Sequence, residues 1–170
     1  LNTQEAACRL AKTAALSFIG ATSKKVKGFG KAGQRTDSQT AQALDYANTV
    51  VKRVPDGDAI AFTDGASRGN PGPSGAGTLL YIQGRNAQPS EDYVPLGNSP
   101  NNHAELWAIG IAIYRVRDLP KEGRPYKLHI FTDSAYSIGC LAGGFVSHTN
   151  KHTIRAVRRA AANAIGDNII

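Results

Sequence analysis

Three acidic residues, Asp64, Glu105 and Asp133, are the side chains of this sequence that could carry out chemistry together. Two of them stand in the same Thr-Asp pair after an apolar run, followed by Gly65 in one case and by Ser134 in the other. Parallel neighbouring strands that each end in an acid bring those acids to one sheet edge, where ligands bind in α/β sheets. Carboxylates gathered there repel one another unless cations lie between them, and Mg²⁺ takes oxygen ligands that it shares with substrate phosphates. The pattern therefore predicts a metal site facing a polyanion.

Each acid also has a purely structural interpretation. Asp64 with the following glycine is a common hairpin turn signal. Glu105 could close a capping box with Asn102, and Asp133 could be the N-cap of a helix that starts at Ser134. Each interpretation is acceptable alone, but together they do not explain why two strands end in the same Thr-Asp pair. We therefore favour the shared metal site.

The bulk composition predicts a globular protein. A length of 170 residues with 41% hydrophobic residues suffices for one domain with a core and an appendage. No apolar run approaches the roughly 20 residues that cross a bilayer, so no membrane span is expected. Cys8 and Cys140 lack paired zinc spacing and predict free thiols, which leaves oxygen to hold any metal. His148 and His152 are four residues apart but have no partner cysteine or glutamate, so we expect surface histidines.

The positive charge is concentrated in the N-terminal third. The formal net charge is +7; residues 1–57 contain nine Lys/Arg and four acids, and residues 58–170 contain eleven and nine. Such a balance favours an anionic partner. The basic N-terminal segment could be a solvated linker, a tether that follows phosphates, or a mitochondrial presequence. Because the sequence contains no methionine, we expect a processed piece or a fragment of a longer protein.

The periodicity predicts a basic helical and flexible N-terminal extension over 1–57 and a mixed α/β domain over 58–170. In the extension, helices are expected at 2–19 and at about 41–54, where Ser38 could cap, with a flexible linker between them. In the domain, three strands form an antiparallel meander and a fourth is reached by a helical crossover that makes it parallel to an earlier one. Strands are expected at 58–64, 78–83, 93–96 and 127–133, and helices at 101–116, 134–141 and 151–165. The last helix is expected to place Arg155, Arg158 and Arg159 on its polar face.

Three segments resemble the leading motifs of type 1 ribonuclease H. They are residues 62–77 (Phe-Thr-Asp-Gly-Ala-Ser-Arg-Gly-Asn-Pro-Gly-Pro-Ser-Gly-Ala-Gly), 101–106 (Asn-Asn-His-Ala-Glu-Leu) and 131–136 (Phe-Thr-Asp-Ser-Ala-Tyr). The resemblance covers roughly residues 58–165 and implies a five-stranded mixed sheet with helices on both faces. It also implies that acids holding two Mg²⁺ ions, with Mn²⁺ as the alternative, hydrolyse the RNA strand of an RNA–DNA hybrid. The residues that it implies as metal ligands are Asp64, Glu105 and Asp133. Those that it implies as contacts to the minor groove of the hybrid are Gly65, Ser67, Asn70, Asn101 and Asn102. Ser134 and Tyr136 would contact the DNA backbone.

The sequence departs from this family at its C-terminal end. Family members continue with a strand, a Gly-His loop and a helix that bears a fourth acid, whereas residues 166–170 (Gly-Asp-Asn-Ile-Ile) do not match that pattern. We therefore expect a ribonuclease H-like fold that lacks its last strand and helix. The chain is expected to come from a retroelement polyprotein, beside a reverse transcriptase, or from a cellular enzyme of the nucleus or mitochondrion. The alternative function is a nucleic-acid-binding or ribonucleoprotein module that kept the fold but lost full activity.

Overall fold

The computed structural model describes residues 34, 36–84, 86–125, 127–142 and 145–165. The helix expected at 2–19 and most of the basic linker lie outside these residues. Within the described part, no helix is both long enough and apolar enough to cross a membrane.

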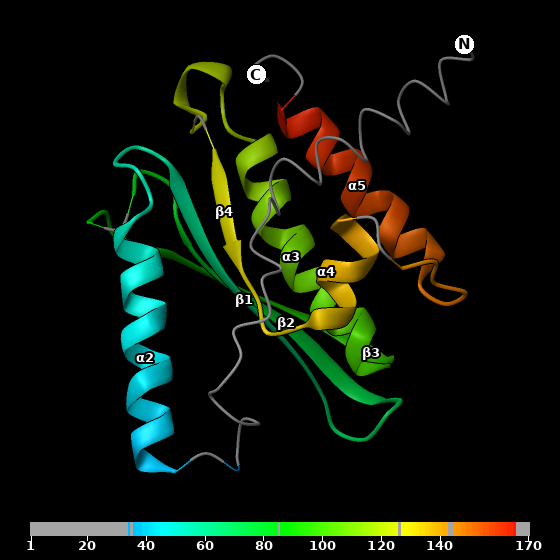
Figure 1. The fold of residues 1–170 in the computed structure, drawn as a ribbon. Helices are drawn as coiled ribbons and strands as arrows, with labels where there is room; N and C mark the ends of the chain where they lie inside the picture. The colour runs from blue at the N-terminus through cyan, green and yellow to red at the C-terminus, as the bar shows by residue number, and fades with distance from the viewer. Residues whose placement is uncertain (1–33, 35, 85, 126, 143–144, 166–170) are drawn as a thin grey trace.

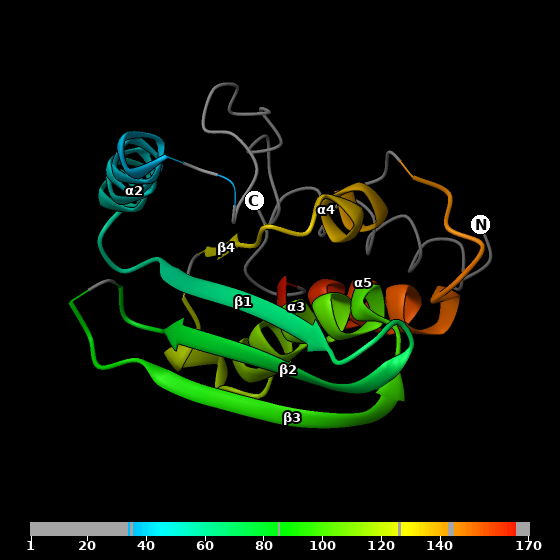
Figure 2. The ribbon, with the colours of Figure 1, turned by 90° about the horizontal axis from the view of Figure 1, so that it is seen from below.

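A four-stranded mixed sheet forms the centre of the fold (Figure 2). Its strands are β1 (Ala59–Ser67), β2 (Gly72–Tyr81), β3 (Ser90–Ser99) and β4 (Leu128–Phe131), in the order β3-β2-β1-β4. β1 pairs antiparallel with β2, which pairs antiparallel with β3, and β4 pairs parallel with β1. The expected meander and the expected parallel crossover are both confirmed.

β1 and β2 are longer than the sequence predicted. The glycine-rich stretch was expected to be a loop, but Gly72 begins β2, and its residues pair with β1 as far as Ser67. The connection shrinks to a tight turn, in which the Arg68 amide donates to the Pro73 carbonyl at 2.8 Å. Asp64 consequently lies inside β1, opposite Gly77, rather than at its end.

Three helices gather on one side of the sheet (Figure 1). α3 (Asn101–Arg117) packs on β1 and β2, α5 (Lys151–Ile165) packs on α3, and α4 (Ala135–Ala142) contacts both of these helices. Gly110 permits a close approach of α3 and α5, since a Cβ there would lie 3.2 Å from Val157 Cγ2. The main core fills this layer and is built from small and branched apolar residues, among them Leu80, Leu106, Ile109, Ile113, Leu128, Val157 and Ala161.

Among the described residues, α2 (Asp37–Lys52) is the helix that lies beside the other side of the sheet, which we call the open face (Figure 1). No residue of α2 is buried. Its N-cap is Thr36 and not the expected Ser38, because Thr36 and Gln39 form a reciprocal capping box. On the open face, the Phe62 ring stacks on the Phe131 ring with their centroids 5.4 Å apart.

Candidate active site

The three acids predicted to act together do meet in the structure. One carboxylate oxygen from each of Asp64, Glu105 and Asp133 lies within 4.8 Å of the other two. The strand register explains why two of them meet, since Phe62 of β1 pairs with Phe131 of β4. Asp64 follows Phe62 by two residues, and Asp133 follows Phe131 by two residues. Asp64 and Asp133 are exposed, whereas Glu105 is buried on the first turns of α3.

The structural interpretations of these acids do not hold. Asp64 is paired inside a strand and is therefore not a turn residue. The N-cap of α3 is Pro100, and no side chain bonds to that cap, so Glu105 closes no capping box. Ser134 caps α4 in place of Asp133, because the Ser134 hydroxyl accepts from the Ser137 amide at 3.2 Å. None of the three carboxylates is used to cap or turn the chain.

The surroundings of Glu105 raise the pKa of its carboxyl group. Burial, followed by the charges of Asp133 and Asp64, raises the pKa of Glu105 from 4.5 to about 7, although hydrogen bonds from the Gly65 backbone and the Asn101 side chain lower it. Its Oε2 atom is buried and has no hydrogen-bond partner in the described part of the chain. In that same part, no Lys, Arg or His forms an ion pair with any of the three acids.

This donor set fits a divalent metal ion. Three carboxylates supply hard oxygen ligands of the kind that Mg²⁺ and Mn²⁺ take. A cation between them would remove the repulsion that raises the pKa of Glu105 and would give its unpartnered oxygen a ligand role. The residues that would hold the ion are thus Asp64, Glu105 and Asp133.

Gly65 allows Glu105 to reach the other two acids. A Cβ on Gly65 would lie 2.2 Å from the Glu105 amide nitrogen and 2.3 Å from the Ala104 carbonyl carbon. Only glycine therefore lets the backbone of β1 touch the first turns of α3. The sequence predicted a substrate contact for Gly65, which stays a prediction; its observed contact is with the helix that positions Glu105.

The remaining residues of the first two motifs form a network that ties the β1–β2 turn to α3. The Asn101 amide donates to Asn70 Oδ1 at 3.2 Å, and the Ser67 hydroxyl lies 2.9 Å from the Ser99 carbonyl oxygen and 2.6 Å from that of Gly69. Asn70 precedes a cis proline and is exposed, as is Asn102. These bonds hold the β1–β2 turn against the start of α3, the helix that carries Glu105.

The third motif connects the cluster to the loop before α5. The Tyr136 hydroxyl lies 2.7 Å from Ser147 Oγ and accepts from Asn150 Nδ2 at 3.2 Å. Ser134 is buried, and its hydroxyl donates to Ser137 Oγ at 2.9 Å. Sequence reasoning missed Ser147 and Asn150, because nothing in their spacing indicates that the loop folds back on α4.

Sequence reasoning also missed a groove beside the acids. It runs over the open sheet face from Asp64 and Asp133, past Phe62 and Phe131, to Val51 of α2. The alternation of apolar and polar residues in β1 could have indicated this face, since Phe62 and Asp64 must point to the same side of a strand.

Comparison with known proteins agrees with the motifs. A family model described as RNase H matches residues 56–165. A ribonuclease H of Nitrosococcus oceani is 44% identical over 75 residues, which are 44% of this chain and 45% of that protein. A ribonuclease H of Pseudomonas savastanoi pv. phaseolicola is 32% identical over 103 residues, or 61% of this chain and 63% of the relative. The chain spans about half the length of the curated relatives that it matches.

Solved structures show the same fold. The RNase H1 of Halobacterium salinarum NRC-1 aligns with a TM-score of 0.51 and 28% identity, covering 65% of this chain and 78% of that one. The LC11-RNase H1, solved in complex with an RNA/DNA hybrid, aligns with a TM-score of 0.54 and 23% identity, covering 61% of this chain and 75% of that one. At that identity the second likeness shows the fold alone.

Proposed function

Because the chain belongs to the ribonuclease H family, we propose that it hydrolyses the RNA strand of RNA–DNA hybrids with divalent metal ions held by Asp64, Glu105 and Asp133. The observation that carries the proposal is the convergence of these three carboxylates, which no described cation of the protein neutralises. A structural role would leave such repulsion uncompensated. A phosphodiester substrate with its metal ions compensates it.

The chain's own residues prepare the acids for this role. The Gly65 backbone and the Asn101 side chain bond Glu105 in its ionised form and orient it toward the other two acids. When bound, Mg²⁺ would polarise a phosphoryl oxygen and make a water molecule more acidic. Mg²⁺ is our first choice, with Mn²⁺ as the alternative, because it binds through few carboxylates and keeps waters.

Recognition of RNA is proposed for the exposed asparagines beside the acids. A ribose 2′-hydroxyl both donates and accepts a hydrogen bond, and it lies in the wide minor groove of an A-like duplex. Asn70 follows β1, which carries Asp64, and Asn102 lies on α3, which carries Glu105; both are exposed and have donors and acceptors. Gly65, Ser67 and Asn101 would support them from within the network. Ser134 and Tyr136 would contribute to contacts with the DNA strand.

The test is metal-dependent cleavage of a hybrid labelled on its RNA strand. The wild-type chain should cut the RNA with Mg²⁺ or Mn²⁺ and should stop when EDTA is added, while Asp64→Asn should bind the hybrid and fail to cut it. Asp45→Asn, which makes the same chemical change on the exposed surface of α2, is the matched control and should cut normally. If the wild-type chain binds the hybrid but never cuts it, the nuclease function is wrong and the alternative, a nucleic-acid-binding module, is supported.

Association with a reverse transcriptase of the same polyprotein is a separate proposal. It rests on the basic composition of residues 1–57, which favours an anionic partner such as nucleic acid. Reading the coding sequence on both sides of the chain tests it directly.

A further inference from the structure

One face of α5 is exposed and carries only positive charge. Its buried residues, Thr153, Ile154, Val157, Ala160, Ala161 and Ala164, turn toward the protein. Lys151, His152, Arg155 and Arg159 are all exposed. At about 100° per residue they fall within an arc of about 100° around the helix. Residues 151–165 contain no Asp or Glu. We call Lys151, His152, Arg155 and Arg159 the α5 cationic face.

Among the residues that the structure describes, three other arginines are bonded within the protein, unlike the residues of the α5 cationic face. Arg115 pairs with Asp92, and Arg117 pairs with Asp118. Arg158, which the sequence placed on the polar face with its two neighbours, turns inward instead and donates to the Cys140 carbonyl. In the described part of the chain, no residue of the α5 cationic face makes an ion pair.

Helix stability does not account for this arrangement. Lys151, Arg155 and Arg159 follow one another at intervals of four residues, where like charges repel and destabilise a helix by about 0.2–0.5 kcal/mol per pair. Acidic residues at neighbouring positions would remove that penalty, and α5 has none. A polyanion bound along the helix would remove it too.

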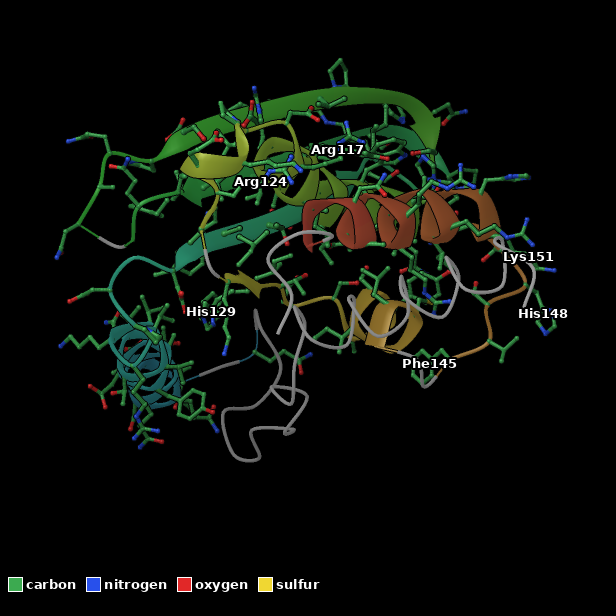
Figure 3. All side chains as sticks on the ribbon, turned by 90° about the horizontal axis from the view of Figure 1, so that it is seen from above. Arg117, Arg124, His129, Phe145, His148 and Lys151 are labelled. Carbon is green, nitrogen blue, oxygen red and sulfur yellow. The ribbon has the colours of Figure 1, made fainter. Side chains whose placement is uncertain are left out.

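The start of α5 is bonded to α3 and α4, the two helices that adjoin the acidic cluster. The Thr153 hydroxyl lies 3.2 Å from Nδ1 of His103, which precedes Glu105 by two residues on α3. Just before α5, Asn150 bonds Tyr136, which follows Asp133 by three residues. Lys151 and His148 project outward at this end of the helix (Figure 3). From Lys151 to Arg159 the face extends for about 12 Å, at about 1.5 Å per residue.

We propose that the α5 cationic face binds the phosphate backbone of the nucleic acid beyond the stretch held at the acidic cluster. The identity of that nucleic acid as an RNA–DNA hybrid rests on the proposed function. A length of about 12 Å spans three to four nucleotides of one strand, at about 3.4 Å each. Arginine forks match phosphate oxygens, and lysine adds a point charge. The arc contains no large apolar side chain, which favours nucleic acid over a protein partner, because protein interfaces rely on buried apolar and aromatic anchors.

The experiment measures binding of a fluorescent RNA–DNA hybrid over a range of KCl concentrations. All proteins are the full 170-residue chain carrying Asp64→Asn, so that the hybrid is not cut. Arg155→Gln/Arg159→Gln should weaken binding several-fold at low salt and reduce the slope of log affinity against log salt by about 1.4–1.8, the loss expected for two phosphate contacts. Thermal unfolding should be unchanged within a few degrees, because both side chains are exposed.

The matched control is Arg53→Gln/Arg115→Gln, which removes the same charge from two exposed arginines elsewhere on the molecule. If both double variants lower affinity and slope equally, only net charge matters and the proposal is overturned. It is also overturned if the α5 variant loses binding to polyglutamate but keeps its affinity for the hybrid, since the occupant is then an acidic protein.

The same variants separate this proposal from the proposed function. If the chain with Asp64 intact cuts hybrids and the salt slope of the α5 variant is normal, the nuclease stands and the α5 cationic face fails. If that chain cuts nothing, while the α5 variant loses slope and its control does not, the nuclease fails and the face stands.

Discussion

The stretch over which β1 and β4 pair, residues 59–62 with residues 128–131, has acidic residues near both of its ends, and their surroundings differ. At the start of β1, Asp58 is buried and its Oδ2 lies 2.8 Å from Nε2 of His129, in β4. At the other end, Asp64 and Asp133 approach the buried Glu105 with no cation among the described residues to neutralise them. At the first end the acid has a hydrogen-bond partner in the protein, whereas at the second end the three acids need a bound cation to offset their repulsion.

The difference separates stabilising acids from functional ones. A buried carboxylate with a base at hydrogen-bond distance contributes to folding, whereas three crowded carboxylates cost folding free energy. Residues that break a local rule of stability without compensation are expected at functional sites. The two ends of β1 and β4 therefore offer variants that should change stability and activity in opposite directions.

The largest effect is expected for Glu105→Gln. Removing the buried ligand charge should lower the rate of hybrid cleavage at least about 10²-fold, as the loss of a key electrostatic group does in other enzymes. The same change should raise stability in the absence of metal by roughly 1 kcal/mol, because it removes the acid whose pKa burial and repulsion raise. Cleavage assays and urea unfolding in EDTA measure the two effects. A variant that loses stability and activity together would show that Glu105 is a structural residue.

A large effect is also expected for Gly65→Ala, which tests how the two strands bring Glu105 into the cluster. The new methyl group would overlap the backbone of α3, which cannot move aside as a side chain can. We expect a loss of about 3 kcal/mol or more, together with loss of cleavage. Gly123→Ala is the control for glycine replacement away from the site: like Gly65 it does not have a positive φ, and nothing lies within 4 Å of a methyl group added there. Urea unfolding measures the free energy of unfolding of both variants. Equal losses of stability would contradict a specific role of Gly65 in packing against α3.

The convergence of the acids could be predicted because it depends on topology. The repeated Thr-Asp pairs and the crossover between the strands imply neighbouring parallel strands, and the register then brings Asp64 and Asp133 together. The capping of α4 by Ser134 could not be separated from capping by Asp133, since both residue types cap helices. The folded structure shows that the Ser134 hydroxyl accepts the helix amide.

Other features depend on tertiary contacts that no local pattern contains. The glycines of residues 72–77 predict a loop, but pairing with β1 and β3 makes them a strand. Arg158 resembles its neighbours in sequence, yet the Cys140 carbonyl lies within its reach. The contact between Gly65 and α3 joins residues 40 positions apart, so no local pattern indicates it, and the substrate contact that the resemblance implies for Gly65 stays a prediction.

A moderate effect is expected for Asp58→Asn, at the opposite end of β1. The change weakens a hydrogen bond to a charged, buried group, which is worth about 1.5–3 kcal/mol, and partial exposure of His129 places the expected loss near 2 kcal/mol. The cleavage rate should stay within about twofold of wild type, because this end lies away from the acids. His129→Gln should give a similar loss, and combining the two should add little, as expected for residues in one interaction. Reduced cleavage in a fully folded Asp58→Asn protein would contradict the contrast between the ends.

The smallest effect concerns pH, and its sign follows from the pKa of Glu105. In the folded protein that pKa is about 7, above the value of 4.5 for an ordinary glutamate, so between these values the folded state binds more protons than the unfolded state. Stability in EDTA should therefore fall as pH rises from about 4.5 to 7, and it should be fully present below that window. The whole shift corresponds to about 3 kcal/mol, but Asp64 and Asp133 are exposed and water screens them, so we expect roughly 1 kcal/mol.

Glu105→Gln should lose this part of the pH dependence, while Asp58→Asn should keep it. Saturating Mg²⁺ should also abolish the fall, because the ion binds the deprotonated carboxylates of the folded state. Urea unfolding at several pH values, with EDTA and with Mg²⁺, measures each of these terms. A fall that persists unchanged in Glu105→Gln would place the titrating group elsewhere and remove the electrostatic distinction between the two ends of β1 and β4.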